Sequence, residues 1–126
     1  MGAKVALRYE GDVTIIDVWG RLTLGDGAGT LRTLIRDLVK ADERALLINL
    51  ENVSYMDSAA IGELVGAFAS VTSAGGHIKL LNPQGRVSEV LGVTKLYTVF
   101  ETFSDEAKAV ASFPSAGGPA PNPAFG

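Results

Sequence analysis

Asp57 and Ser58 stand between an apolar run and a helical pattern, where a hydroxyl group can meet a ligand or a modifying enzyme. The run at residues 45–50 has the composition of a buried strand, and apolar residues after Ser58 recur at helical spacing. Asp and Ser are both favoured at the N-cap of a helix. If Asp57 is the cap, the Ser58 hydroxyl is free in the first turn, where the helix dipole favours a phosphate. Judged by residue type alone, the favoured interpretation is that Ser58 is an ordinary N-cap.

Residues 56–62 resemble the signature motif of the STAS family, the anti-sigma factor antagonists of bacteria. In that motif an Asp precedes a phosphorylated Ser or Thr, and a small residue, a Gly and an aliphatic residue follow. The matching positions are Asp57, Ser58, Ala59 and Ile61. Ala60 stands where the family usually has Gly. The similarity extends over residues 5–113, nearly the whole chain, and is therefore stronger than a motif match alone.

The resemblance implies an anti-sigma factor antagonist that is not itself an enzyme. Unphosphorylated on Ser58, it would bind an anti-sigma factor serine kinase and so release a sigma factor. The kinase would phosphorylate Ser58, and a serine phosphatase would reverse the step. The alternative within the family is a scaffold, or a small cytoplasmic subunit of a signalling complex or lipid transporter. The partner-binding residues expected from the resemblance and the helix pattern are Leu24, Gly25, Asp26, Tyr55, Met56, Asp57, Ala59, Gly62 and Gly66.

Small residues recur along the helix that follows Ser58, at steps of three and four and away from its apolar face. They are Ala59, Gly62, Gly66, Ala69 and Ser73. A stripe of this kind permits close approach by another surface. The sequence leaves two readings open: the stripe packs against another helix of the same domain, or it is a docking face beside Ser58.

The sequence offers few residues that could form a catalytic or cofactor-binding site. A hydrolase would need a base near Ser58, and the one histidine, His77, lies about 20 Å away at the far end of the helix. A single histidine and no cysteine exclude a multi-histidine or thiolate metal site. The glycine-rich segment 25–29 lacks the Lys and Ser/Thr of a phosphate-binding P-loop. We expect no cofactor and no metal.

Composition indicates one folded domain in a reducing cytoplasm. The chain has 126 residues, of which 47% are hydrophobic and 20% charged, and its net charge is −3. The sequence has no dense Lys/Arg cluster, so we expect it to bind neither nucleic acid nor a membrane. No apolar run approaches the roughly 18 residues of a membrane-spanning helix. We expect a single STAS-like domain at residues 1–113, a disordered Pro/Gly-rich tail at 114–126, and a monomer or weak dimer.

The pattern of elements predicts an α/β fold with a small mixed sheet flanked by about four helices. Strands at 5–9 and 13–19 should form a hairpin, and further strands are expected at 45–50, at 78–81 and within 97–102. Alternation of helix and strand after the hairpin implies parallel pairing. Tyr9, Trp19 and Phe100 fit core or strand positions.

The four helices are predicted from apolar spacing and from capping residues. The first should bury Leu31, Leu34, Ile35 and Leu38, and the second Ile61, Leu64, Val65, Phe68 and Val71. Asn82-Pro83 should start the third helix, with Gly92 at its end. Ser104 should cap the last.

Overall fold

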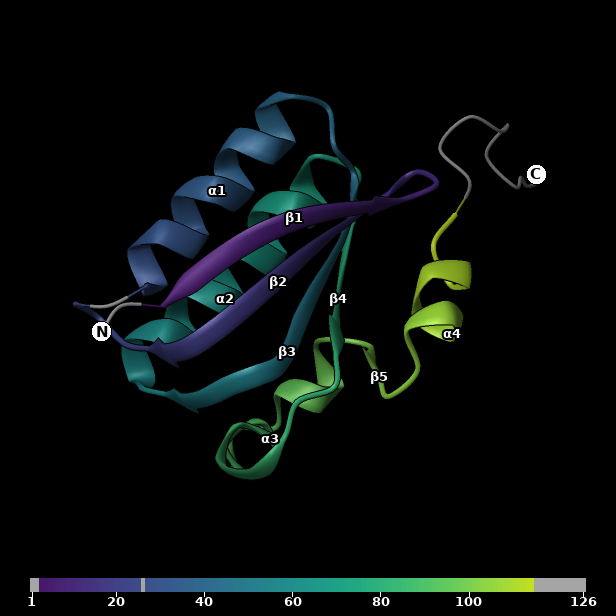
Figure 1. The fold of residues 1–126 in the computed structure, drawn as a ribbon. Helices are drawn as coiled ribbons and strands as arrows, with labels where there is room; N and C mark the ends of the chain where they lie inside the picture. Colours follow the sequence, from purple (N-terminus) through teal and green to yellow (C-terminus); the bar gives the residue numbers. More distant parts are fainter. Residues whose placement is uncertain (1–2, 26, 115–126) are drawn as a thin grey trace.

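The chain begins with the predicted hairpin (Figure 1). The computed structural model describes residues 3–25 and 27–114. β1 (Lys4–Glu10) and β2 (Val13–Leu22) pair antiparallel, and Glu10 faces Val13 across a two-residue turn. Gly11 has a φ of 59°, which the first central position of a type II′ hairpin turn requires.

The remaining strands add to this hairpin in parallel, in the order β1-β2-β3-β4-β5. They are β3 (Ala45–Met56), β4 (His77–Leu81) and β5 (Thr102–Phe103). The helices are α1 (Ala28–Lys40), α2 (Ser58–Ser73), α3 (Gly85–Val93) and α4 (Glu106–Ala111), with a short 3-10 turn at Leu96–Thr98. The mixed five-stranded sheet with four flanking helices confirms the predicted fold class.

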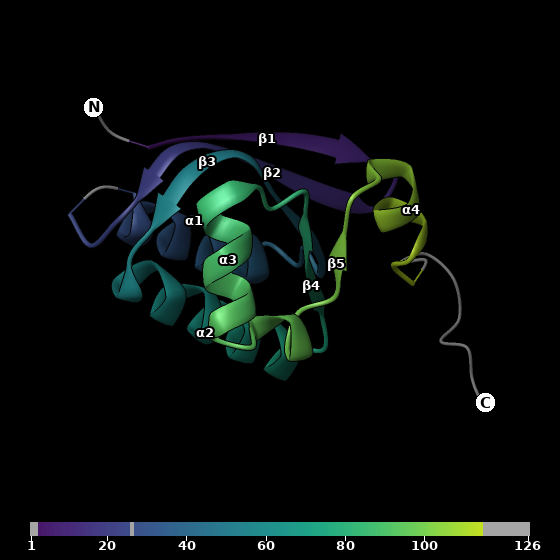
Figure 2. The ribbon, with the colours of Figure 1, turned by 90° about the horizontal axis from the view of Figure 1, so that it is seen from below.

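The main core lies between one face of the sheet and the helices α1, α2 and α3 (Figures 1 and 2). α1 buries Leu31, Ile35 and Leu38 as predicted, with Leu34 half-buried. α2 buries Leu64 and Val71 as predicted, but its other buried residues are Ala60 and Ala67 in place of Ile61, Val65 and Phe68. Small alanines let the helix lie close to the sheet, which turns Val65 outward to 42% exposure and leaves Ile61 and Phe68 half-buried.

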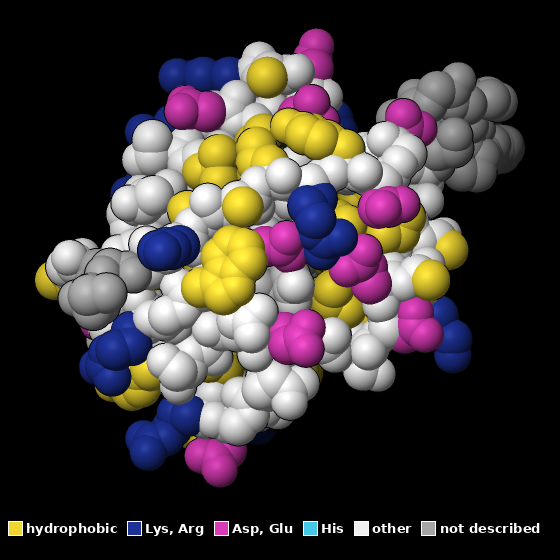
Figure 3. All heavy atoms as spheres, viewed as in Figure 1, with side chains coloured by type: hydrophobic (Ala, Val, Ile, Leu, Met, Phe, Trp, Pro, Cys, Tyr) yellow, Lys and Arg dark blue, Asp and Glu magenta, His cyan; other side chains and the backbone are white. Residues whose placement is uncertain are grey.

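The opposite face of the sheet is covered by α4 at one end only. There Ala109 and Phe113 pack on a smaller apolar cluster with Val13, Ile15 and Leu47. Figure 3 shows this face, on which basic, acidic and apolar side chains are interspersed. Tyr9 and Trp19 lie in strands but are 59% and 39% exposed, whereas the Phe100 side chain is fully in the core.

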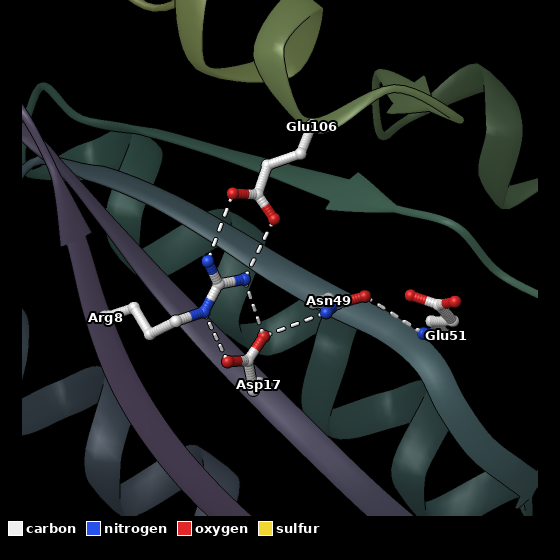
Figure 4. A network of polar contacts seen from close by, with 5 residues as sticks. All are labelled: Arg8, Asp17, Asn49, Glu51 and Glu106. Carbon is white, nitrogen blue, oxygen red and sulfur yellow. Dashed lines mark hydrogen bonds and ion pairs between the residues drawn. The ribbon is translucent and has the colours of Figure 1, made fainter.

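A network of charges fastens α4 to the sheet (Figure 4). The Arg8 guanidinium donates to both carboxylate oxygens of Asp17, at 2.6 and 3.0 Å, and to both of Glu106, at 3.1 and 2.9 Å. Asn49 donates a further bond to Asp17. The hydrogen bonds from Arg8 lower the pKa of both carboxyl groups and raise that of the guanidinium.

A buried lysine holds the other end of α4. Lys79 of β4 donates to the Ser112 carbonyl and hydroxyl at 3.1 and 2.9 Å and pairs with Glu101 at 2.7 Å. Its ammonium group also lies 4.7 Å from the centre of the Phe113 ring. These partners satisfy the donors of an ammonium group that lies in the protein interior.

Several predicted boundaries are wrong, including the end of the third helix, which continues past Gly92 to Val93. β3 continues to Met56 rather than ending at residue 50. The third helix begins at Gly85, because Asn82 has a left-handed φ of 53° that ends the strand and excludes it from a helix. Asp105, not Ser104, caps α4, and its carboxylate accepts the Lys108 N–H at 3.1 Å.

The final strand is also shorter than the expected segment, since residues 96–98 form a 3-10 turn and only Thr102 and Phe103 pair with β4. The predicted tail lies outside the described residues beyond Pro114. Within the described residues, no helix is long and apolar enough to cross a membrane.

Candidate functional site

Ser58 is the first residue of α2, and of the two candidate capping residues it is Asp57 that is the N-cap. The Asp57 carboxylate accepts the Ala60 N–H at 2.9 Å, which satisfies one of the free donors of the first turn. The Ser58 side chain is exposed and makes no hydrogen bond within the described residues. Its hydroxyl therefore stands free at the positive end of the helix dipole.

Asp57 also joins the start of α2 to the loop after β2. Its second carboxylate oxygen accepts the Leu24 N–H at 2.9 Å, and its own N–H donates to the Leu22 carbonyl at 3.1 Å. The backbone donors of Ala60 and Leu24, in that order, lower the pKa of Asp57 below its usual range. One ionised carboxylate thus fixes the position of the Leu24 loop relative to Ser58.

The residues around Ser58 form a mixed polar and apolar surface. Leu24 is 78% exposed at the loop tip, and Gly25 is exposed beside it. Tyr55 is half-buried, and the Arg21 guanidinium lies over its ring at 4.6 Å. Asp26, also expected to bind a partner, lies outside the described residues.

An apolar pocket of about 290 Å³ opens directly beside Ser58. It is lined by Tyr55, Met56, Asp57, Ser58, Ile61, Val90 and Thr94. Met56 is only 2% exposed and belongs to the main core, so its side chain shapes the pocket floor. Val90 and Thr94 come from the third helical segment and were not anticipated, because only the folded chain brings them to Ser58.

The stripe of small residues borders a second hollow of about 380 Å³, the groove between α1 and α2. Ala59, Gly62 and Gly66 line it, and a Cβ added at either glycine would meet no atom within 4 Å. Both glycines are exposed, so no neighbouring helix packs closely on them. Arg32, paired with Glu63 at 3.3 Å, and Arg36 contribute basic groups on the α1 side.

The other candidate chemistry lies apart from this site. His77 begins β4 beyond the far end of α2, whose 16 residues span about 24 Å. Ser54, near the end of β3, is exposed, and its hydroxyl donates only a 3.4 Å bond to the Gly20 carbonyl. Among the described residues, no group of three His, Cys, Asp or Glu side chains could hold a metal ion.

The chain matches the STAS domain family over residues 4–109. It belongs to the STAS domain family. The match includes every strand and the Asp57–Ser58 helix start, which confirms the resemblance inferred from the motif.

Two curated relatives of this STAS domain carry names of anti-sigma factor antagonists. One is a TM1081 homologue of Thermotoga neapolitana, 34% identical over 68 residues. The other is the anti-sigma-B factor antagonist of Bacillus subtilis, 39% identical over 56 residues. The matches take in 52% and 44% of this chain and span 60% and 51% of the relatives' own lengths.

Solved structures share the fold of this STAS domain. An anti-sigma factor antagonist of Thermotoga maritima superimposes with a TM-score of 0.81 at 22% identity, covering 86% of this chain and 93% of that one. The antagonist SpoIIAA in its unphosphorylated form gives 0.66 at 20% identity, covering 86% and 96%. SpoIIAA of Bacillus in the phosphorylated form gives 0.67 at 21%, covering 86% and 97%.

Proposed function

We propose that this STAS domain is an anti-sigma factor antagonist controlled by phosphorylation of Ser58. The free, exposed hydroxyl of Ser58 at the start of α2 is the observation that carries the proposal. The names of its relatives support the assignment, as does the existence of a phosphorylated form of a protein with this fold. Unphosphorylated, the chain would bind an anti-sigma factor serine kinase and release a sigma factor.

The partner would contact the surface around Ser58. The exposed Leu24 tip and the apolar pocket lined by Ile61 and Val90 offer apolar contacts on either side of the hydroxyl. Gly62 and Gly66 leave room for a close approach along α2. Asp57 contributes by holding the Leu24 loop in place.

Phosphorylation would prevent this docking through local charge and bulk. A phosphate adds about −1.5 to −2 charges at neutral pH, and the N–H groups of the first helical turn that Asp57 leaves unbonded can donate hydrogen bonds to it, so the domain itself does not rearrange. A partner surface without a matching basic pocket would have to bury that charge, which costs several kcal/mol. A serine phosphatase would restore binding.

Reconstitution tests the proposal. The chain is used to recover its partner from cells of its source, and the purified partner is then incubated with it, ATP and magnesium. Mass spectrometry should find one phosphate on the chain, absent from Ser58→Ala and retained in Ser54→Ala, the matched exposed control. Phosphate on both variants would contradict the proposal. Recovery of a transporter ATPase in place of a kinase would favour the scaffold or transporter-subunit alternative.

A further inference from the structure

The outer side of β1 is a free strand edge. β1 forms one margin of the sheet, and β2 is its only strand neighbour among the described residues. In a two-residue hairpin the residues that flank the turn exchange hydrogen bonds, and bonding residues alternate from there along the strand. Glu10 flanks the turn. Even-numbered residues therefore bond to β2, while Val5, Leu7 and Tyr9 direct their N–H and C=O groups outward.

The β1 edge is neither short nor interrupted by proline, and its charged side chains, Lys4, Arg8 and Glu10, include both signs. Within the described residues, the backbone groups of Val5, Leu7 and Tyr9 make no hydrogen bond outside the β1–β2 ladder. Exposed edges are generally short, interrupted by proline or covered. β5, at the opposite margin, has two residues, whereas β1 has seven and no proline. Tyr9 is 59% exposed on it.

We propose that β1 pairs antiparallel with β1 of a second copy of this chain, about a two-fold axis at Leu7. In that register Leu7 faces Leu7 of the copy, and Val5 faces Tyr9. Lys4 faces Glu10 at both ends of the ladder, so each end carries an opposite-charge pair. Odd-numbered residues face odd-numbered residues and even-numbered residues face even-numbered ones. The helix-covered faces of both sheets therefore lie on the same side of the joined sheet.

The charge pattern of β1 selects this register over its neighbours. An axis at Ala6 would set Lys4 opposite Arg8, and an axis at Arg8 would set two Arg8 side chains opposite each other. Like charges directly opposite destabilise a pair of strands. A shift by a single residue would place the helix-covered face of one sheet beside the open face of the other. Neither Lys4 nor Glu10 forms an ion pair within the described residues, so both are available.

The dimer leaves both Ser58 surfaces accessible. Antiparallel pairing turns one copy end for end, and Ser58 lies at one end of the sheet, so the two sites point in opposite directions. The contact involves one strand from each copy and falls below about 1,200 Å², at the low end of specific interfaces. Dimerisation therefore requires high protein concentration, and it stands independently of the function proposed for Ser58.

Charge reversal in the full chain tests the register. Lys4→Glu places two carboxylates opposite each other at each end of the ladder, and Glu10→Lys places two ammonium groups there. Each variant should weaken dimerisation in sedimentation equilibrium about tenfold. The double variant should restore it, and so should an equal mixture of the two single variants, whose heterodimer has opposite charges at both ends. Lys40→Glu on α1 is the control for net charge, and circular dichroism checks folding.

Amide exchange gives a second readout that locates the contact. Exchange of the Leu7 and Tyr9 amide protons should slow as the protein concentration rises, while exchange in the Leu24 loop should not. A chain that stays monomeric at its highest soluble concentration overturns the proposal. So does a dimer that Lys40→Glu weakens as much as Lys4→Glu, or one that the mixture of single variants fails to restore.

Discussion

Replacing Arg8 with Met should lower the free energy of unfolding by about 2 kcal/mol at neutral pH. The methionine keeps the apolar stem and removes the four hydrogen bonds to Asp17 and Glu106. The Glu106 side chain is 37% exposed, so its pair contributes only about 0.5 kcal/mol. Asp17 is 12% exposed, and leaving its buried carboxylate without a charged partner costs about 1.5 kcal/mol more.

Urea unfolding at two pH values measures the effect. Arg8 lowers the pKa of Asp17 and Glu106 in the folded state, so their stabilisation is complete above their unfolded pKa values of about 4. It is lost as the pH falls through the lowered pKa values. The difference in the free energy of unfolding between the native chain and Arg8→Met should therefore be largest at neutral pH and decrease in acid. At neutral pH the melting temperature of Arg8→Met should be about 8 °C lower.

Arg36→Met is the matched control, because Arg36 is exposed on α1 and has no ion pair within the described residues. It should change the free energy of unfolding by less than about 0.5 kcal/mol. An Arg8→Met loss that is the same at neutral and acid pH would refute the reasoning, since it would reflect packing of the stem. A loss no larger than that of Arg36→Met would do the same.

Four further outcomes are expected. Leu64→Ala, in the centre of the main core, should cost about 3 kcal/mol in a urea titration, whereas a loss under 1 would mean that α2 readjusts over the gap. Gly66→Leu should leave the melting temperature unchanged or slightly raised, since its side chain enters open space, yet weaken binding of the partner; unchanged affinity would remove the groove from the docking surface. Phosphorylation of Ser58 should shift amide resonances only at residues 55–62 and around Leu24, and shifts across the sheet would contradict a local mechanism. Removing residues 115–126 should barely alter the melting temperature, because their composition offers little apolar surface; a large drop would show that they dock on the domain.

The order of elements and the position of Ser58 could be predicted because both depend on local signals. The strand-forming segments, the two-residue turn between the first two strands and the Asp57 cap are each encoded in a short stretch of chain. The cap's second hydrogen bond, to Leu24, depends on residues 33 apart and has no sequence signature. The same holds for the pocket beside Ser58, whose far wall comes from Val90 and Thr94.

The buried face of α2 illustrates a different limit. A hydrophobic pattern ranks residues by size and polarity, so it favoured Val65 over the smaller Ala60 and Ala67. The folded chain buries the alanines because they allow close contact between helix and sheet, and Val65 remains 42% exposed. Asn82 is similar, since only its left-handed backbone shows that Pro83 does not open a helix.

The position of α4 also has a consequence for synthesis on the ribosome. Glu106 pairs with Arg8 across 98 positions of sequence, so this ion pair forms only after almost the whole domain has been translated. Until then the apolar patch of Val13, Ile15 and Leu47 faces water on strands already able to pair. Contacts between such distant positions close slowly, and an uncovered patch on a nascent sheet is prone to aggregation. The yield of native protein should therefore depend on how soon a helix of six residues reaches its place on the sheet.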